Sequence, residues 1–132
     1  MLGMIKSRGV LTDNGVYLQP HERLTVDFFL ERGNDVELIV PSYTVGRKNA
    51  DIILYGKTWE MKSPESANIN TLMKRLKYAA KQSPNLIIDL RRVKGDEKKV
   101  SSTIQTKFRM SKRLKVMLII TKSNQLLEIK KH

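Results

Sequence analysis

The sequence predicts an α/β fold (an α+β mixed sheet) with helices on the faces of the sheet. Helical spacing of apolar residues over 69–82 and 96–112 alternates with nearly continuous apolar runs over 85–90 and 115–121. Such runs are typical of strands buried on both faces, and strand-helix-strand crossovers place these strands in one sheet. From residue 20 onward, the predicted order of elements is α-β-β-β-α-β-α-β-β.

The N-terminal part of the chain is weakly patterned. Asp13-Asn14-Gly15 separates two short apolar stretches, which is the signal of a two-residue hairpin turn. We therefore expect residues 1–19 to form an N-terminal hairpin or a linker from an upstream segment. Residues 20–132 then form a single domain, as a chain of 132 residues suggests.

A helix is expected over 20–32, because the stretch opens with proline and stops at Gly33. Glu22 falls on the same helical stripe as Val26 and Phe29, which is expected to face the core. A carboxylate on such a stripe either serves a site or only complements the helix dipole, and both interpretations stay open.

Two short strands joined by a turn are predicted within residues 49–64. Strand side chains alternate between the two faces of a sheet. Glu60 and Lys62 are therefore expected to point away from the face that carries Trp59 and Met61.

The remaining elements follow from the same rules. A strand over 36–40 ends at a proline, and a last strand over 125–129 follows a Ser-Asn turn. The helix over 69–82 is expected to bury Ile69, Leu72, Met73, Leu76 and Ala80. The helix over 96–112 is expected to bury Val100, Ile104 and Phe108.

The net charge of +12 is unevenly distributed. Residues 1–90 hold 12 Lys/Arg and 10 Asp/Glu, whereas residues 91–132 hold 13 Lys/Arg and 3 Asp/Glu. A basic part beside a near-neutral part predicts a polyanion partner, with nucleic acid favoured over a solvated basic face or an acidic protein. The predicted nucleic-acid contacts are Arg47, Lys48, Arg91, Arg92, Lys94, Lys107, Arg109 and Lys112.

Composition also excludes some classes of site. Cysteine is absent, so the chain has neither disulfides nor a thiolate zinc site. The longest clean apolar run is Val116–Ile120, far shorter than the about 20 residues of a membrane-spanning helix, and no membrane anchor is expected. Residues 1–10 lack the apolar region of a signal peptide.

One of three Glu-x-Lys triplets is a candidate catalytic motif. The triplets begin at Glu60, Glu97 and Glu128, and only the first combines a strand setting with an aspartate, Asp51, on a preceding strand. The alternative interpretations stay open: Asp51 as a turn residue, and Glu60 with Lys62 as a solvent-facing pair.

The chemistry of this group points to phosphodiester hydrolysis. Asp51 and Glu60 can hold a divalent metal ion, Mg²⁺ or Mn²⁺ with Zn²⁺ as a further candidate, and such an ion activates water. Lys62 would orient the water or stabilise charge that develops on the phosphate. Glu22, on the neighbouring helix, would bind the metal through a bridging water.

The motif order resembles the PD-(D/E)xK nuclease superfamily, whose restriction-endonuclease-like core is α-β-β-β-α-β. Glu22 matches the helical glutamate, Asp51 the motif aspartate, and Glu60 and Lys62 the (D/E)xK pair. Ala50 stands where the family often has proline, a position that is not catalytic. The resemblance covers roughly residues 20–120.

Within that superfamily, the stretch from Glu60 to the 85–90 run resembles the C-terminal tRNase domains of CdiA-type contact-dependent inhibition toxins and other polymorphic toxins. This resemblance implies a tRNA substrate, a cognate immunity protein with an acidic surface, and Ser63, Lys77 and Gln82 at the site. It also implies a secreted or cell-surface-delivered toxin domain that acts in the target-cell cytoplasm; a stand-alone nuclease would be cytoplasmic.

Three alternatives stay open. A DNA nuclease of the same fold, such as a Holliday junction resolvase or restriction-like enzyme, shares the order of motifs. The chain can also be a non-catalytic nucleic-acid-binding module. A metal-free RNase would need a general acid or base whose pKa is about 7, usually a histidine, and the sequence contains only His21 and His132.

Overall fold

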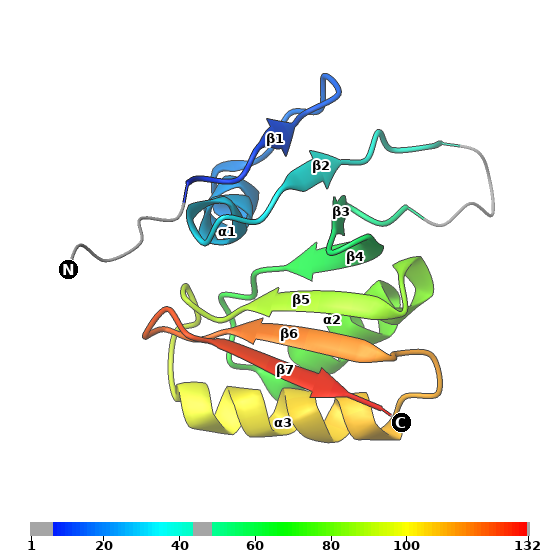
Figure 1. The fold of residues 1–132 in the computed structure, drawn as a ribbon. Coiled ribbons are helices and arrows are strands. Elements are labelled where there is room, and N and C mark those ends of the chain that lie inside the picture. The colour runs from blue at the N-terminus through cyan, green and yellow to red at the C-terminus, as the bar shows by residue number, and fades with distance from the viewer. Residues whose placement is uncertain (1–6, 44–48, 132) are drawn as a thin grey trace.

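The computed structural model of the chain describes residues 7–43 and 49–131. Within these ranges, seven strands form one sheet in the order β1-β2-β3-β4-β5-β6-β7, with three helices beside it (Figure 1). The elements are β1 Leu11–Thr12, α1 Pro20–Glu31, β2 Val36–Leu38, β3 Ile52–Leu54, β4 Lys57–Lys62, α2 Ile69–Gln82, β5 Asn85–Asp89, α3 Glu97–Met110, β6 Val116–Ile120 and β7 Leu126–Lys130.

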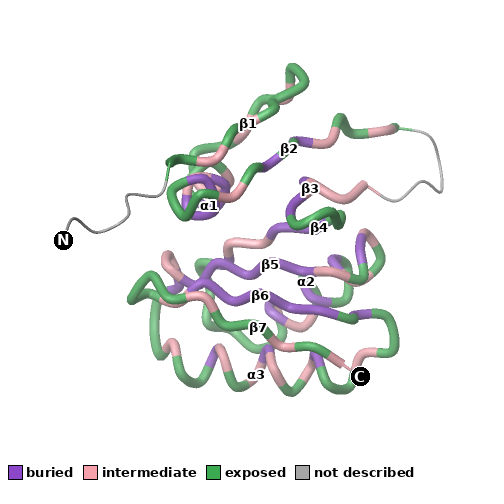
Figure 2. Tube along the Cα trace, viewed as in Figure 1, coloured by how far each residue is buried: buried purple, intermediate pink, exposed green. Residues whose placement is uncertain are grey.

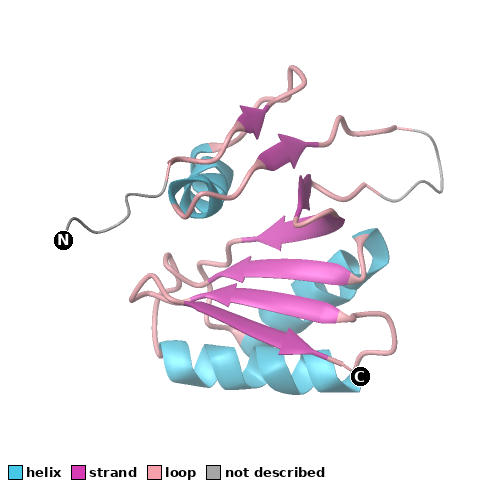
Figure 3. Cartoon of the chain, viewed as in Figure 1, coloured by secondary structure: helices cyan, strands magenta, loops and turns pink. Residues whose placement is uncertain are grey.

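The sheet is mixed, as predicted. Strand β1 runs parallel to β2, and β4, β5 and β6 run parallel to one another, whereas the β2–β3, β3–β4 and β6–β7 pairs are antiparallel. Figure 3 shows α1 beside the first strands and α2 and α3 beside the parallel strands. Within the described ranges, no helix combines the length and the apolar character needed to cross a membrane.

The two faces of the sheet support separate hydrophobic cores. One core joins α1 to the sheet and includes Phe29, Ile87 and Leu118. The other joins α2 and α3 to the opposite face and includes Ile88 and Ile119 among its strand residues. Strands β5 and β6 alternate between these cores and are buried throughout most of their length (Figure 2), which explains their continuous apolar runs.

The β3–β4 hairpin matches the predicted alternation. Tyr55 (φ 55°) and Gly56 (φ 72°) form its two-residue turn, in which both residues take the left-handed conformation that tight hairpins require. Trp59 and Met61 belong to the core on the α1 side. The side chains of strand neighbours alternate, so Glu60 faces the α2 side.

The helices begin and end within two residues of the predicted positions. Asn68 caps α2 by accepting a hydrogen bond from the amide of residue 71 at 3.1 Å, and Asp96 caps α3. The buried stripe of α3 is confirmed, but that of α2 is partly wrong. Ile69 is 46% exposed, because it lies in the first turn beyond the core, and Ala79 is buried instead.

The predicted N-terminal turn is present, but the predicted hairpin pairing is wrong. Asn14 (φ 51°) and Gly15 (φ 78°) form the turn, while residues 16–19 form no strand. Strand β1 instead pairs with β2, with Leu11 opposite Val36. Gly9 packs closely against the loop before β2: a Cβ at this position would lie 1.9 Å from the backbone oxygen of Asn34.

Candidate active site

Strand pairing brings Asp51, Glu60 and Lys62 together. The amide of Asp51 donates to the carbonyl of Trp59 at 2.8 Å, which continues the β3–β4 ladder by one residue. The Oδ2 atom of Asp51 accepts a hydrogen bond from the amide of Met61 at 2.7 Å. The Nζ atom of Lys62 lies 3.3 Å from Oε2 of Glu60. These contacts hold two carboxyl groups and one ammonium group on a single hairpin.

Glu60 is the electrostatically unusual member of this group. Its side chain is buried, and within the described ranges its Oε1 atom has no hydrogen-bond partner. The pKa of Glu60 is raised to about 8: burial is the largest cause, the neighbouring Asp51 also raises it, and Lys62 opposes the shift. A buried carboxyl oxygen without a partner is costly, so the site gains from any cation that reaches it.

Helix α2 covers this site with two side chains one turn apart. The Nζ atom of Lys62 lies 5.2 Å from the ring centroid of Tyr78, a cation–π distance. The Oε1 atom of Gln82 accepts a hydrogen bond from the amide of Asn49 at 2.9 Å, which fixes the segment leading to Asp51. The sequence prediction included Gln82 but missed Tyr78, whose i, i+4 spacing from Gln82 was the available signal.

Glu22 has a different partner. Its Oε1 atom accepts a hydrogen bond from the amide of Gln19 at 2.8 Å, as the third residue of a helix often does at a capping box. Among residues 7–43 and 49–131, no three His, Asp or Glu side chains gather in a group able to hold a metal ion. The structure thus gives Glu22 a capping contact, and its role as a water-mediated ligand stays a prediction.

Ser63 belongs to a second polar cluster at the carboxyl ends of β4 and β5. Its hydroxyl lies 3.2 Å from that of Thr25 in α1, which donates to Oδ2 of Asp89 at 2.8 Å. Thr25 and Asp89 are both buried, and Asp89 also accepts from the guanidinium of Arg91 at 2.8 Å. The sequence prediction missed Thr25 and Asp89, which tie α1 to the sheet next to the site.

The predicted nucleic-acid contacts fall into three groups. Arg91, Arg92 and Lys94 have partners within the chain: Asp89 pairs with Arg91, and Glu65 pairs with the other two at 3.2 and 3.6 Å. The hydrogen bond to Asp89 raises the pKa of Arg91. The second group has no ion pair with any described residue: Lys107, Arg109 and Lys112. The third group, Arg47 and Lys48, lies outside the described residues.

Lys77 does not join the residues around Lys62 that are described above. It lines a groove between α2 and α3 together with Lys107 and Lys112. Lys77 therefore lies near Lys107 and Lys112, two of the predicted nucleic-acid contacts.

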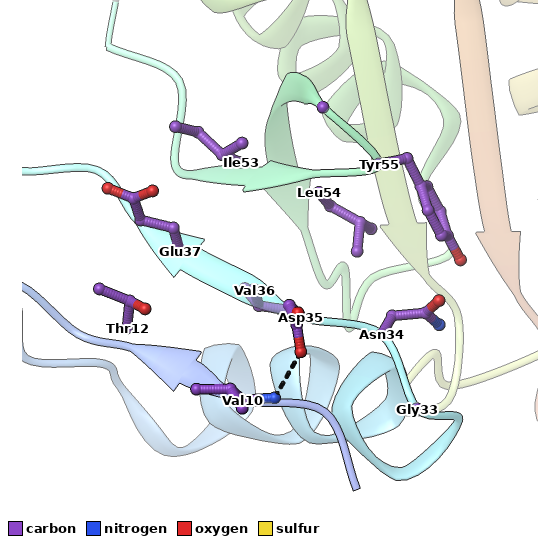
Figure 4. Close-up of a pocket in the computed structure, with 11 residues that line it drawn as sticks. Val10, Thr12, Gly33, Asn34, Asp35, Val36, Glu37, Ile53, Leu54 and Tyr55 are labelled. Carbon is purple, nitrogen blue, oxygen red and sulfur yellow. Dashed lines mark hydrogen bonds between the residues drawn. The ribbon is translucent and has the colours of Figure 1, made fainter. Parts of the chain in front are cut away.

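An open pocket of about 460 Å³ lies elsewhere, along β1, β2 and β3 (Figure 4). Its carboxylates are Asp35 and Glu37, and Asp35 accepts a hydrogen bond from the amide of Val10 at 2.7 Å. The amide group of Asn14 donates to Glu37 at 3.1 Å. These contacts connect the first strands, and none of the predicted site residues that the structure describes lines this pocket.

The fold and the site together define a mixed-sheet domain with helices on both faces, in which the buried carboxyl group of Glu60 lies beside a partly buried aspartate and a lysine. Residues 48–126 match the family described as the contact-dependent growth inhibition CdiA C-terminal domain. The chain belongs to this family, which confirms the predicted resemblance to CdiA C-terminal domains. Membership of the PD-(D/E)xK superfamily stays a prediction.

A solved structure shows the same fold. A chain in the "CdiA-CT/CdiI toxin and immunity complex from Burkholderia pseudomallei" is 17% identical to this chain, with a TM-score of 0.70. The match covers 93% of this chain and 100% of that chain. A search of curated proteins found no matching relative.

Proposed function

We propose that this chain is the toxin domain of a contact-dependent growth inhibition system and that it hydrolyses phosphodiester bonds in tRNA. The observation that carries the proposal is the buried Glu60 carboxyl group, held between Asp51 and Lys62 on one hairpin. Family membership supports the toxin role. The PD-(D/E)xK pattern, which the observed run of elements from α1 to β5 accommodates, supports the nuclease chemistry.

A divalent metal ion fits the residues present. The unpartnered Oε1 of Glu60 and the neighbouring Asp51 supply hard oxygen donors, and Mg²⁺ is commonly bound by one or two carboxylates with water completing the shell. When bound, such an ion would lower the pKa of a coordinated water and neutralise phosphate charge. Its positive charge would also favour the ionised form of Glu60.

The chain's own residues would do the remaining work. Lys62 is one-quarter exposed, so its ammonium group can reach both Glu60 and a bound phosphate. It would donate hydrogen bonds to the oxygens on which negative charge increases. The Tyr78 ring restricts the position of that ammonium group, and the Met61 amide restricts the position of the Asp51 carboxylate. Preorganisation of this kind lowers the cost of reaching the transition state.

A toxin of this kind needs an inhibitor in the cell that makes it. The similar structure from Burkholderia pseudomallei is a complex of a toxin and an immunity protein. We therefore propose a cognate immunity protein as a partner of this chain, with an acidic surface that complements its charge of +12. The proposed place of action is the cytoplasm of the target cell, where tRNA is available.

The experiment compares three substrates: tRNA, duplex DNA and a four-way DNA junction, each with Mg²⁺ or Mn²⁺. We expect cleavage of tRNA and little cleavage of either DNA. Preferred cleavage of the junction would instead identify a resolvase-like DNA nuclease. Tight binding of tRNA without cleavage in any metal would contradict the nuclease and indicate a binding module.

A further inference from the structure

A groove between α2 and α3 is distinct from the carboxylate site. Its volume is about 320 Å³, and Leu76, Ala80 and Leu114 form an apolar part of its lining. Five cationic side chains also line it: Lys77, Lys81, Lys107, Lys112 and Arg113. We call this feature the α2–α3 groove.

The positive charge of the α2–α3 groove is uncompensated. Residues 66–88 and 98–127, which supply α2 and most of α3, contain neither aspartate nor glutamate. Within the part of the chain that the structure describes, none of the five cationic side chains forms an ion pair. Like charges brought together in this way favour a bound polyanion.

Further cations lie at the α3 end of the groove. The Nζ atom of Lys131 donates a hydrogen bond to the carbonyl of Ser111, which lines the groove, and lies 5.0 Å from the ring centroid of Phe108. Burial lowers the pKa of Lys131, and the positive charge of Lys115 lowers it further. The position of Lys131 at Ser111 therefore places a further cationic side chain next to the α3 end of the groove.

Helix α2 connects this groove to the carboxylate site. Tyr78 contacts Lys62 and Gln82 contacts the segment before Asp51, whereas Lys77 and Lys81 line the groove. Each lysine precedes one of these site-facing residues, and consecutive helical residues are about 100° apart around the axis. The site and the groove therefore flank the exposed face of one helix.

We propose that the α2–α3 groove binds backbone phosphates of the RNA substrate on one side of the phosphate that is cleaved. The inference rests on the proposed nuclease function and extends it to a second contact region. A strand that crosses the exposed face of α2 would reach both regions. Contacts of this kind position a nucleic acid without reading its sequence.

Binding of pooled tRNA tests the groove directly. All proteins carry Asp51→Ala, so that the RNA stays intact during fluorescence anisotropy titrations at several salt concentrations. The groove variant adds Lys81→Gln, Lys107→Gln and Lys112→Gln. The matched control adds Lys57→Gln, Lys98→Gln and Lys122→Gln, three lysines outside the groove and without ion pairs among described residues.

The groove variant should bind tRNA at least about tenfold more weakly than the control at 0.1 M salt. Its slope of log K against log salt should be shallower by about 2 to 3, because each lost phosphate contact contributes about 0.7 to 0.9. Affinities of the two variants within twofold of each other would overturn the proposal. Unchanged tRNA affinity with weaker binding of poly-glutamate would also overturn it and assign the groove to an acidic protein.

Cleavage measurements separate this inference from the proposed function. If the unsubstituted protein cleaves no nucleic acid but the groove substitutions still weaken tRNA binding, the groove is supported and the nuclease proposal fails. The groove and control substitutions are also compared with Asp51 intact. If the unsubstituted protein cleaves tRNA and these two variants have equal kcat/KM, the groove proposal fails while the nuclease proposal stands.

Discussion

Replacing Glu60 with glutamine should remove a pH-dependent loss of stability from the metal-free protein. The pKa of Glu60 rises from 4.5 to about 8 in the folded state, chiefly because the carboxyl group is buried. The folded state therefore favours the neutral form of the Glu60 carboxyl group over its charged form. A raised carboxyl pKa means that stability is highest below the unfolded-state pKa and falls as pH rises toward the folded-state value.

The size of the effect follows from the shift. Each unit of pKa difference corresponds to about 1.4 kcal/mol, so the free energy of unfolding should fall by about 2 to 3 kcal/mol between pH 5 and pH 7. Glutamine cannot ionise, and its amide group can donate a hydrogen bond to Asp51. Glu60→Gln should therefore be more stable than the unsubstituted protein at pH 7 to 8 and nearly equal to it at pH 4.5.

Urea unfolding in EDTA, followed by circular dichroism between pH 4.5 and pH 8, measures this difference. Glu128→Gln is the control, because Glu128 begins the Glu-x-Lys triplet on β7 and is half exposed, with Lys130 at 3.5 Å. The control should keep the pH dependence of the unsubstituted protein. The reasoning is refuted if Glu60→Gln shows that same pH dependence, since the buried carboxyl group would then not be its source.

Three further substitutions test other contacts. Thr25→Val removes a buried hydroxyl that donates to Asp89, and it should lower the free energy of unfolding by about 1 to 3 kcal/mol in urea titrations; no change would contradict the buried network. Gly9→Ala places a Cβ against the backbone oxygen of Asn34 and should lower the melting temperature by several degrees, whereas an unchanged value would contradict the close approach. Tyr78→Ala should lower kcat for tRNA by about 3- to 10-fold with little effect on stability, because the site lysine loses its aromatic neighbour; an unchanged kcat would show that the ring does not position the lysine.

Local patterns explain why the β3–β4 hairpin could be predicted. The alternation of Trp59 and Met61 with Glu60 and Lys62 has the period of a strand, and it is visible within a few residues. The aspartate before β3 reaches the same place because antiparallel pairing follows directly from the tight turn. The buried strands and helices of the C-terminal half could be predicted for the same reason, since each has its own hydrophobic pattern.

Contacts between distant segments could not be predicted in this way. The parallel pairing of Leu11 with Val36 depends on α1 packing against the sheet, which no local pattern encodes. The bond between Thr25 and Asp89 joins residues 64 positions apart. Lys77 has the spacing of an outer-face residue, and only the packing of α2 against α3 shows that it lines a groove.

Cleavage of tRNA with and without a divalent metal is the most direct test of the central claim, that Asp51, Glu60 and Lys62 form a metal-dependent nuclease site. We predict cleavage in Mg²⁺ or Mn²⁺, no cleavage in EDTA, and a loss of at least about 100-fold for Asp51→Ala and Lys62→Ala. The matched control, Glu128→Ala with Lys130→Ala, should cleave at the rate of the unsubstituted protein. Cleavage that persists in EDTA, or a folded Asp51→Ala protein with full activity, would contradict the claim.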